Sequence, residues 1–227
     1  MFLRPSASSW RYEGPPFDPD VESFHRRLPD YNITPLVSLP DVAKELGLGY
    51  VFIKDESNRL GLPAFKILGA SWAIYRVAAT HCDLPLTVSL RELGAAARAK
   101  GLKLVSCTAG NWGRAVSRMA KYLQVSAIIF VPNTMDQATQ NMISGEGAKV
   151  VLVDGNYEES IEAAKKEAEK ENALLVMDVS WEGYEEIPQA RYSYLWKQSS
   201  LIQWIVGRRG LQYHVNRNRS TTGRTHI

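Results

Sequence analysis

The sequence predicts an α/β fold in which helices flank a parallel β-sheet. Three observations support this class. Short apolar segments of strand type alternate with segments of helical periodicity from about residue 89 to residue 177. A capping box marks the start of the alternation. The 227 residues are 45% hydrophobic and 22% charged, an ordinary balance for a globular protein with a buried core. Strands that alternate with helices form βαβ units, so the strands should lie parallel in one sheet.

The first elements lie in a segment rich in proline and aromatic residues. We expect a short helix over residues 41–46 and a strand over residues 50–54. Residues 55–63, DESNRLGLP, are typical of a polar loop. Apolar residues then recur at helical spacing from residue 64 to about residue 79, which predicts a helix there.

Helices and strands alternate regularly after this region. Ser89 and Glu92 form the capping box that opens the alternation. The expected elements are a helix from Ser89 to about residue 100, a strand over 102–107, a helix from Asn111, a strand over 126–131, a helix from about Asp136, a strand over 148–153, a helix over 157–171 and a strand over 173–177.

The stretch CTAGN, residues 107–111, joins a predicted strand to a predicted helix. In open parallel sheets ligands bind outside the carboxyl ends of the strands, and helix N-termini there attract anions. The glycines Gly110 and Gly113 on either side of Asn111 indicate that the backbone here approaches another group, such as a ligand, at close range. A tight strand-to-helix connection without a ligand explains the same residues equally well.

The composition excludes several classes of protein. No apolar run approaches the ~20 residues of a membrane helix, and the N-terminus lacks the apolar centre of a signal peptide. The two cysteines, Cys82 and Cys107, predict no disulfide framework, and the four scattered histidines predict no metal site. We therefore expect a cytoplasmic protein that binds neither a membrane nor a metal.

Charge is distributed unevenly along the chain, whose formal net charge is +3. Residues 1–186 carry 20 basic and 24 acidic side chains, whereas the residues after Glu186 carry seven basic and no acidic ones. A basic segment is an electrostatic footprint for nucleic acid. This one contains no recognised binding motif, and such tails are usually just solvated. Nucleic-acid binding is therefore the less favoured alternative.

Three motifs occur in a specific order: IKDESNRLGLPAFKILGASWA at 53–73, CTAGNWGRA at 107–115 and MDVSWEGYEEIP at 177–188. Together they closely resemble the diaminopropionate ammonia-lyases, pyridoxal-phosphate enzymes built like the tryptophan synthase β chain. The likeness covers roughly residues 30–188. It implies pyridoxal 5'-phosphate as cofactor, an amino acid as substrate, and elimination of ammonia from 2,3-diaminopropionate to give pyruvate and ammonia.

The resemblance assigns Lys66 as the catalytic lysine that forms the imine with the cofactor aldehyde. Its apolar neighbours, Phe65, Ile67 and Leu68 among them, should partly desolvate the amine. Desolvation favours the neutral amine, which attacks carbonyls and accepts protons. The structural alternative is a surface lysine whose stem lies along a helix.

The resemblance also implies the other residues of the site. Asn111 would hydrogen-bond the phenolic oxygen of the cofactor ring, with Gly110 and Gly113 beside the cofactor. Helix capping is the structural alternative for Asn111, and the two roles are compatible. Asp178 would be a second catalytic residue that holds a substrate amine or assists proton transfer. An aspartate in a turn at a strand end is the alternative for Asp178.

Two positions depart from the family pattern. Ala109 stands where many members carry an acidic residue that acts on one enantiomer of the substrate, so use of both enantiomers is not expected. Trp112 stands where histidine is common, and we expect it to change packing above the ring more than chemistry.

The resemblance also predicts the domain organisation. Residues 1–65 would begin an incomplete large domain, residues 66–188 would form a complete small α/β domain, and residues 189–227 would be a divergent, disordered basic tail. The glycine-rich loop that cradles the cofactor phosphate in the family has no counterpart in 189–227. The chain thus resembles a truncated enzyme with poor activity. The full-length family is expected to form homodimers, and a non-catalytic remnant of the fold is a further alternative.

Overall fold

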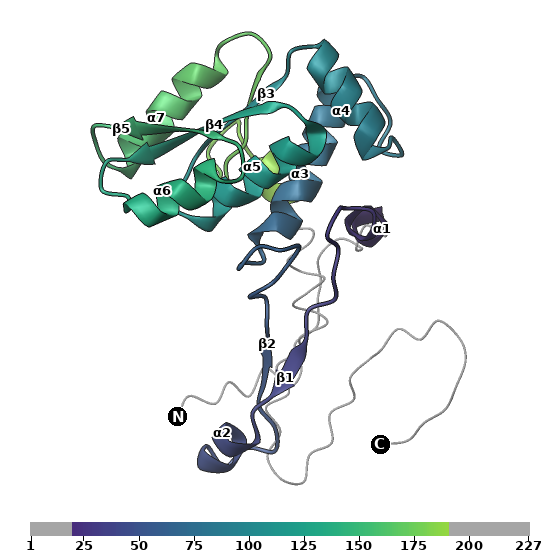
Figure 1. Cartoon of the computed structure of the whole chain (residues 1–227), viewed down its shortest axis with the longest axis vertical. Coiled ribbons are helices and arrows are strands. Elements are labelled where there is room, and N and C mark those ends of the chain that lie inside the picture. The colour runs from purple at the N-terminus through teal and green to yellow at the C-terminus, as the bar shows by residue number, and fades with distance from the viewer. Residues whose placement is uncertain (1–19, 191–227) are drawn as a thin grey trace.

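A four-stranded parallel sheet organises the structure, a computed structural model that describes residues 20–190 (Figure 1). Its strand order is β5-β4-β3-β6. Neighbouring strands pair in parallel, with Val105 opposite both Ile128 and Leu175. The strands are β3 (Lys103–Cys107), β4 (Ser126–Pro132), β5 (Lys149–Val153) and β6 (Ala173–Leu175). This confirms the predicted α/β class with a parallel sheet.

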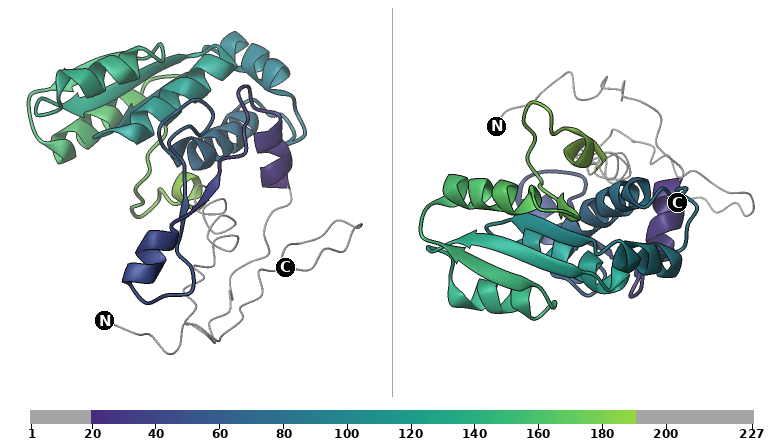
Figure 2. Two further views of the ribbon diagram at one scale, coloured as in Figure 1. Left: turned by 60° about the horizontal axis from the view of Figure 1, so that its bottom comes forward. Right: turned by 90° about the horizontal axis from the view of Figure 1, so that it is seen from above.

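Helices cover both faces of the sheet because alternate residues of each strand point to opposite sides. Leu104 and Ile129 belong to the larger core cluster, on the side of α5 (Asn111–Leu123) and α6 (Gln137–Ser144). Val105, Phe130 and Ala164 belong to the smaller cluster, on the side of α7 (Tyr157–Ala168). Figure 2 shows α7 and α6 on opposite faces of the sheet.

The helix α3 (Lys66–His81) lies beside the sheet and packs against α5 and α4 (Leu90–Ala99). Twelve of its 16 residues are buried. A further helix, α1 (Asp20–Arg26), packs on α3 through Phe24, whose ring centroid lies 4.5 Å from that of Tyr75. Helix α1 was not predicted from the sequence, because seven residues are too few to show a helical period.

A narrow arm, residues 33–54, projects away from the sheet and the helices that flank it (Figure 1). It consists of the antiparallel pair β1 (Leu36–Ser38) and β2 (Phe52–Lys54), with α2 (Pro40–Glu45) in the connection between them. The predicted helix and strand of this region are confirmed in α2 and β2. The short strand β1 was not predicted, because it is recognisable only by its pairing with β2.

Most predicted boundaries hold, and the capping box of Ser89 and Glu92 is present at the start of α4. Two elements end earlier than predicted: α7 at Ala168 and β6 at Leu175. No helix within residues 20–190 has the length and hydrophobicity that a membrane span requires. The predicted tail lies outside these residues apart from 189 and 190, and the division at 65/66 and 188/189 stays a prediction.

Candidate active site

Lys66 and Asp178 form the centre of the candidate site. Lys66 is the first residue of α3, and Asp178 lies three residues beyond the end of β6. The Lys66 Nζ donates to Oδ2 of Asp178 at 2.9 Å. The fold therefore brings the two residues predicted as catalytic, which are 112 positions apart, into direct contact.

The surroundings of Lys66 are less apolar than its sequence neighbours suggest. Ile67 and Leu68 are fully buried in the core, but Phe65 is 41% exposed. The Lys66 side chain is itself 36% exposed, and the Asp178 side chain is 13% exposed. The apolar neighbours thus fix α3 in the core, while the amine lies at the surface and pairs with a carboxylate.

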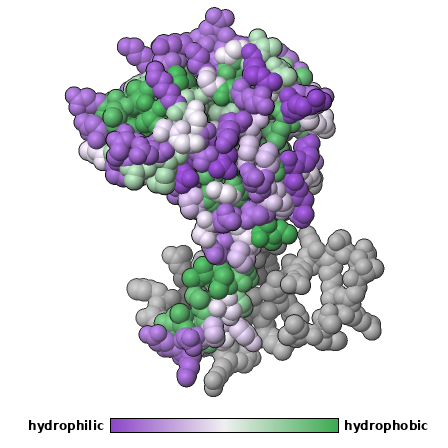
Figure 3. All heavy atoms as spheres, viewed as in Figure 1, coloured by the Kyte–Doolittle hydropathy of each residue, from purple (hydrophilic) through white to green (hydrophobic). Residues whose placement is uncertain are grey.

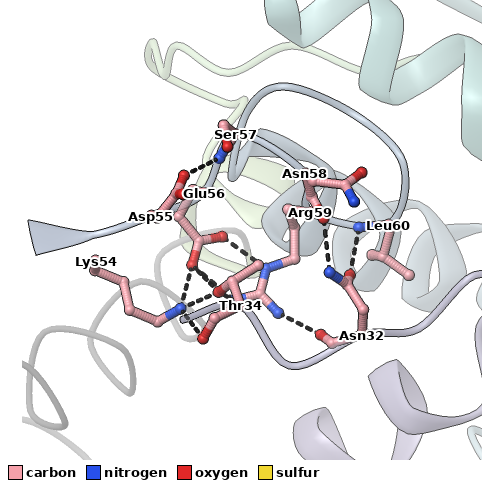
Figure 4. A network of polar contacts seen from close by, with 9 residues as sticks. All are labelled: Asn32, Thr34, Lys54, Asp55, Glu56, Ser57, Asn58, Arg59 and Leu60. Atoms are coloured by element: carbon pink, nitrogen blue, oxygen red, sulfur yellow. Dashed lines mark hydrogen bonds and ion pairs between the residues drawn. The ribbon is translucent and has the colours of Figure 1, made fainter. Parts of the chain in front are cut away.

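A polar network holds the loop that leads to Lys66 (Figure 4). Glu56 accepts hydrogen bonds of 2.7 Å from the Thr34 hydroxyl and the Arg59 guanidinium, and Lys54 lies 2.9 Å from the same carboxylate. Burial opposes ionisation of Glu56, but hydrogen bonds from Arg59, Thr34 and Lys54 outweigh it and lower its pKa to about 2. A charged Glu56 therefore joins the base of the arm to this loop.

Asn32 extends the same network along the loop (Figure 4). Its side chain accepts from the Leu60 N–H at 2.8 Å and donates to the Asn58 carbonyl at 2.7 Å. Arg118 of α5 donates to the Leu60 carbonyl at 2.8 Å, and so ties the loop to the domain. Contacts with Asn32 and with Arg118 thus hold the backbone of this loop before α3 begins.

The turn between β3 and α5 is held by a threonine. The Thr108 hydroxyl accepts the N–H groups of Gly110 at 2.9 Å and of Gly113 at 3.1 Å. Gly110 occupies the N-cap position, and no side-chain capping bond is made from it. The alternative role of Asn111 as a helix cap is therefore wrong, because Asn111 is already the first helical residue and the Thr108 hydroxyl accepts from the N–H groups of the turn.

The two glycines of the turn have different environments. A Cβ atom at Gly113 would lie 2.4 Å from Cγ2 of Thr108 and 3.1 Å from Cγ2 of Ile129, so only glycine fits there. A Cβ atom at Gly110 would meet nothing within 4 Å. Packing within the chain accounts for Gly113, whereas Gly110 faces open space in which a ligand has room. Contact of either glycine with a cofactor stays a prediction.

Asn111 and Asp178 lie at the same edge of the sheet. Asn111 follows the carboxyl end of β3 and Asp178 follows the carboxyl end of β6, and these two strands are parallel neighbours. Asn111 is exposed, and its side chain makes no hydrogen bond within residues 20–190. The ion pair with Asp178 brings Lys66 to this edge, which is where ligands bind in open α/β sheets.

The thiol and phenol groups near Asp178 remain uncharged at neutral pH. Burial, and then the Asp178 carboxylate, raise the pKa of the Cys107 thiol to about 12. Burial, with Cys107 and Asp178 as further causes, raises the pKa of Tyr157 to about 12. Burial also raises the pKa of Cys82, beyond the end of α3. Neutral thiol and phenol groups therefore lie beside the Lys66–Asp178 pair.

Three residues at this edge have contacts that the sequence did not predict. Ser106, Trp112 and Tyr184 hydrogen-bond the backbone just before Asp178. Trp112 departs from the family pattern and was expected to affect packing above the cofactor ring, whereas its indole N–H donates to the Val176 carbonyl at 3.1 Å. Trp112 and Tyr184 both lie in the motifs that carry the family resemblance, and this was the sequence signal by which they could have been identified.

A family model described as a pyridoxal-phosphate dependent enzyme matches residues 28–193. The match includes Lys66, Asn111 and Asp178, the three side chains found at one sheet edge. The chain belongs to the pyridoxal-phosphate-dependent enzymes.

Curated members of this family include closely similar relatives. The diaminopropionate ammonia-lyase of Salmonella typhimurium is 36% identical over 174 residues, which cover 74% of this chain and 43% of that protein. The enzyme of the same name from Escherichia coli K12 is 35% identical over 170 residues, 74% of this chain and 42% of that protein. A catabolic L-threonine dehydratase of Staphylococcus aureus is 31% identical over 144 residues, 63% of this chain and 36% of that protein. The chain spans less than half the length of these relatives.

Solved structures in the family agree with the sequence relatives. Apo diaminopropionate ammonia-lyase of Escherichia coli superposes with a TM-score of 0.71 at 33% identity, covering 76% of this chain and 47% of that one. The same enzyme in complex with an aminoacrylate–pyridoxal-phosphate azomethine intermediate gives 0.70 at 31% identity, over 78% and 45%. The chain is thus related to pyridoxal-phosphate-dependent ammonia-lyases and dehydratases.

Proposed function

We propose that this chain carries the lysine-bearing part of an ammonia-lyase that acts on 2,3-diaminopropionate with pyridoxal 5'-phosphate. The reaction is an α,β-elimination in which the Cα–H and Cβ–N bonds break. Hydrolysis of the remaining enamine nitrogen then consumes one water and gives pyruvate and a second ammonia. The observation that carries the proposal is the 2.9 Å contact between Lys66 and Asp178 at the carboxyl edge of the sheet.

Lys66 has the two properties that the reaction requires of its lysine. Its side chain is 36% exposed, so a carbonyl compound can reach the amine. Its stem begins a helix buried in the core, so the amine has a fixed origin. We assign Lys66 to hold the cofactor aldehyde and, once released from it, to accept the proton from the substrate α-carbon. The bound cofactor supplies delocalisation of the electron pair left at that carbon.

Asp178 is assigned to the substrate side of the reaction. Its carboxylate pairs with an ammonium group, that of Lys66, and its side chain is 13% exposed. A carboxylate in a partly desolvated position binds an ammonium group more strongly than one in open water. It can therefore hold an amine of diaminopropionate, or assist transfer of the proton that the departing β-amine requires.

The residues at the start of α5 fit the cofactor. Asn111 is exposed, and its amide is available to donate to the phenolic oxygen of the cofactor ring. Gly110 offers open space above the backbone. Gly113 lets the Thr108 hydroxyl reach both glycine N–H groups, and so shapes the turn. We assign Asn111, Gly110 and Gly113 to cofactor binding on these grounds.

Deamination of serine or threonine is the second candidate, favoured by the match to the L-threonine dehydratase. Both candidates need Lys66 and the cofactor, and they differ in the leaving group. A carboxylate at the site favours the substrate with an additional amine, so diaminopropionate is preferred. Product assays separate the two candidates. A diaminopropionate ammonia-lyase should release pyruvate from diaminopropionate, but should release neither pyruvate from serine nor 2-oxobutanoate from threonine.

The test is reductive trapping of pyridoxal phosphate on the 227-residue chain with borohydride, followed by peptide mapping. Lys66 should be the most heavily modified lysine. Lys100, which is also exposed and paired with an aspartate, serves as the internal control. Any pyruvate released from diaminopropionate should disappear in Lys66→Ala. Equal modification of Lys66 and Lys100, or activity that survives Lys66→Ala, would overturn the assignment and favour a non-catalytic remnant.

A further inference from the structure

The chain leaves the sheet between β6 and Asp178. The ladder between β3 and β6 ends at the pair Val105 and Leu175. One further backbone bond follows, from the Val176 N–H to the Val105 carbonyl at 2.8 Å. The next N–H group of β3, that of Cys107, points to the sulfur of Met177 at 3.2 Å. Beyond Leu175 the backbone therefore needs partners other than a neighbouring strand.

Side chains from two elements supply partners for the Val176 carbonyl. The Ser106 hydroxyl donates to it at 2.6 Å, and the Trp112 indole N–H donates to it at 3.1 Å. Ser106 lies in β3, Trp112 lies in the first turn of α5, and both side chains are fully buried. Two donors on one carbonyl oxygen use both of its lone pairs.

Tyr184 spans the same segment from the other side. Its hydroxyl donates to the Leu175 carbonyl at 2.9 Å and accepts the Met177 N–H at 2.8 Å. Because burial raises the pKa of Tyr184, the phenol stays neutral and can donate and accept at once. Its ring stacks on Trp181 with centroids 4.3 Å apart and an interplanar angle of 12°. This stacking limits the movement of the hydroxyl.

We propose that Ser106, Trp112 and Tyr184 form a backbone clamp on residues 175–177 that positions the Asp178 carboxylate against Lys66. Asp178 is one peptide unit beyond the clamped Met177. The direction of its side chain therefore depends on where the clamp holds the backbone. Groups that act in catalysis must stay within ~0.5 Å of their productive position. Four hydrogen bonds to three consecutive residues provide that restraint where the sheet does not.

The clamp also gives a reason for a tryptophan at position 112. A buried indole offers one N–H donor and no acceptor, which matches a carbonyl oxygen. The same helical turn begins with Asn111, so one short segment would contact the cofactor through Asn111 and fix Asp178 through Trp112. The inference deepens the proposed function, on which it rests for the meaning of the Lys66–Asp178 pair.

The experiment compares Tyr184→Phe and Ser106→Ala with Tyr75→Phe in the 227-residue chain. Tyr75 is a matched control, because its buried hydroxyl also binds two backbone groups, the carbonyls of Leu86 and Val88, but in α3 and away from Asp178. The first readout is the carboxyl ¹³C resonance of Asp178, which needs no cofactor. Its chemical shift reports which group the Asp178 carboxylate contacts. In both clamp variants it should move toward its position in Lys66→Ala, whereas Tyr75→Phe should leave it unchanged.

The second readout is the rate of pyridoxal-phosphate trapping on Lys66. Ser106→Ala loses one clamp hydrogen bond and should change this rate about tenfold. Tyr184→Phe loses two and should change it by at least as much, while Tyr75→Phe keeps the parent rate. An Asp178 resonance in both clamp variants that coincides with the parent's would overturn the clamp. A shifted resonance in a chain whose Lys66 is no more reactive than Lys100 would support the clamp and overturn the proposed function. Trp112→Phe extends the series if that variant folds.

Discussion

The arm and the domain beside it use apolar residues in opposite ways. In the domain, α3 buries twelve of its 16 residues, and β3 is covered on both faces. On the arm, seven large apolar side chains are 39–79% exposed, out of twelve such side chains among the described residues. They are Ile33, Leu36, Val37, Val42, Leu46, Tyr50 and Ile53. Figure 3 shows part of this apolar surface over the arm.

These two patterns of burial indicate which contacts stabilise each part of the described structure. A two-stranded ribbon cannot enclose a core, so its apolar residues gain little by folding within residues 20–190. The arm is instead joined to the rest by the polar network around Glu56 and Arg59. Hydrophobic burial should therefore dominate the stability of the domain, and polar contacts should dominate at the base of the arm.

The largest expected effect comes from the same substitution made in both regions. Leu104→Ala, in β3, removes a fully buried side chain and should lower the free energy of unfolding by about 2–5 kcal/mol. Leu36→Ala, in the arm, removes a side chain that is 55% exposed and should change it by less than about 0.5 kcal/mol. Urea unfolding of the two variants measures both changes, and equal losses of unfolding free energy would show that the arm and the domain do not differ in hydrophobic stabilisation.

The second effect concerns the base of the arm. The pKa of Glu56 is about 2 in the folded protein against an ordinary 4.5, so its contribution to stability is complete above pH 4.5. That contribution is lost as the pH falls through 2, and it amounts to about 3 kcal/mol. The difference in unfolding free energy between the parent and Glu56→Gln should therefore shrink from about pH 6 to about pH 3. A difference that does not change with pH would show that the charge of Glu56 is not what holds the arm.

The smallest effect tests packing inside the domain. Gly113→Ala places a Cβ atom against Thr108 and should lower the unfolding free energy by about 1–3 kcal/mol. Thr108→Ser removes the methyl group in the way and keeps the hydroxyl that binds the turn. The double variant should therefore recover part of the loss in thermal unfolding. A loss that is the same in both backgrounds would mean that Thr108 is not the obstacle.

The sequence predicted the parallel sheet because its strands and helices are local patterns of sufficient length. It did not predict β1, whose three residues are ordered only by pairing with β2. It extended β6 to residue 177, since the apolar run continues, but side-chain donors take over the backbone after Leu175. It named Lys66 and Asp178 from motifs, yet their contact depends on how α3 packs against the domain, which local sequence does not encode.

The burial of Cys82 and Cys107 has a practical consequence for labelling. These are the two cysteines of the chain, both are buried, and burial raises the pKa of each thiol. Because alkylating reagents attack thiolates, the native protein should react slowly with maleimides at neutral pH. A cysteine introduced at Ser38 in the arm would then be the site of attachment for a fluorophore or spin label, and the mobility of that label could be followed without removing either native cysteine.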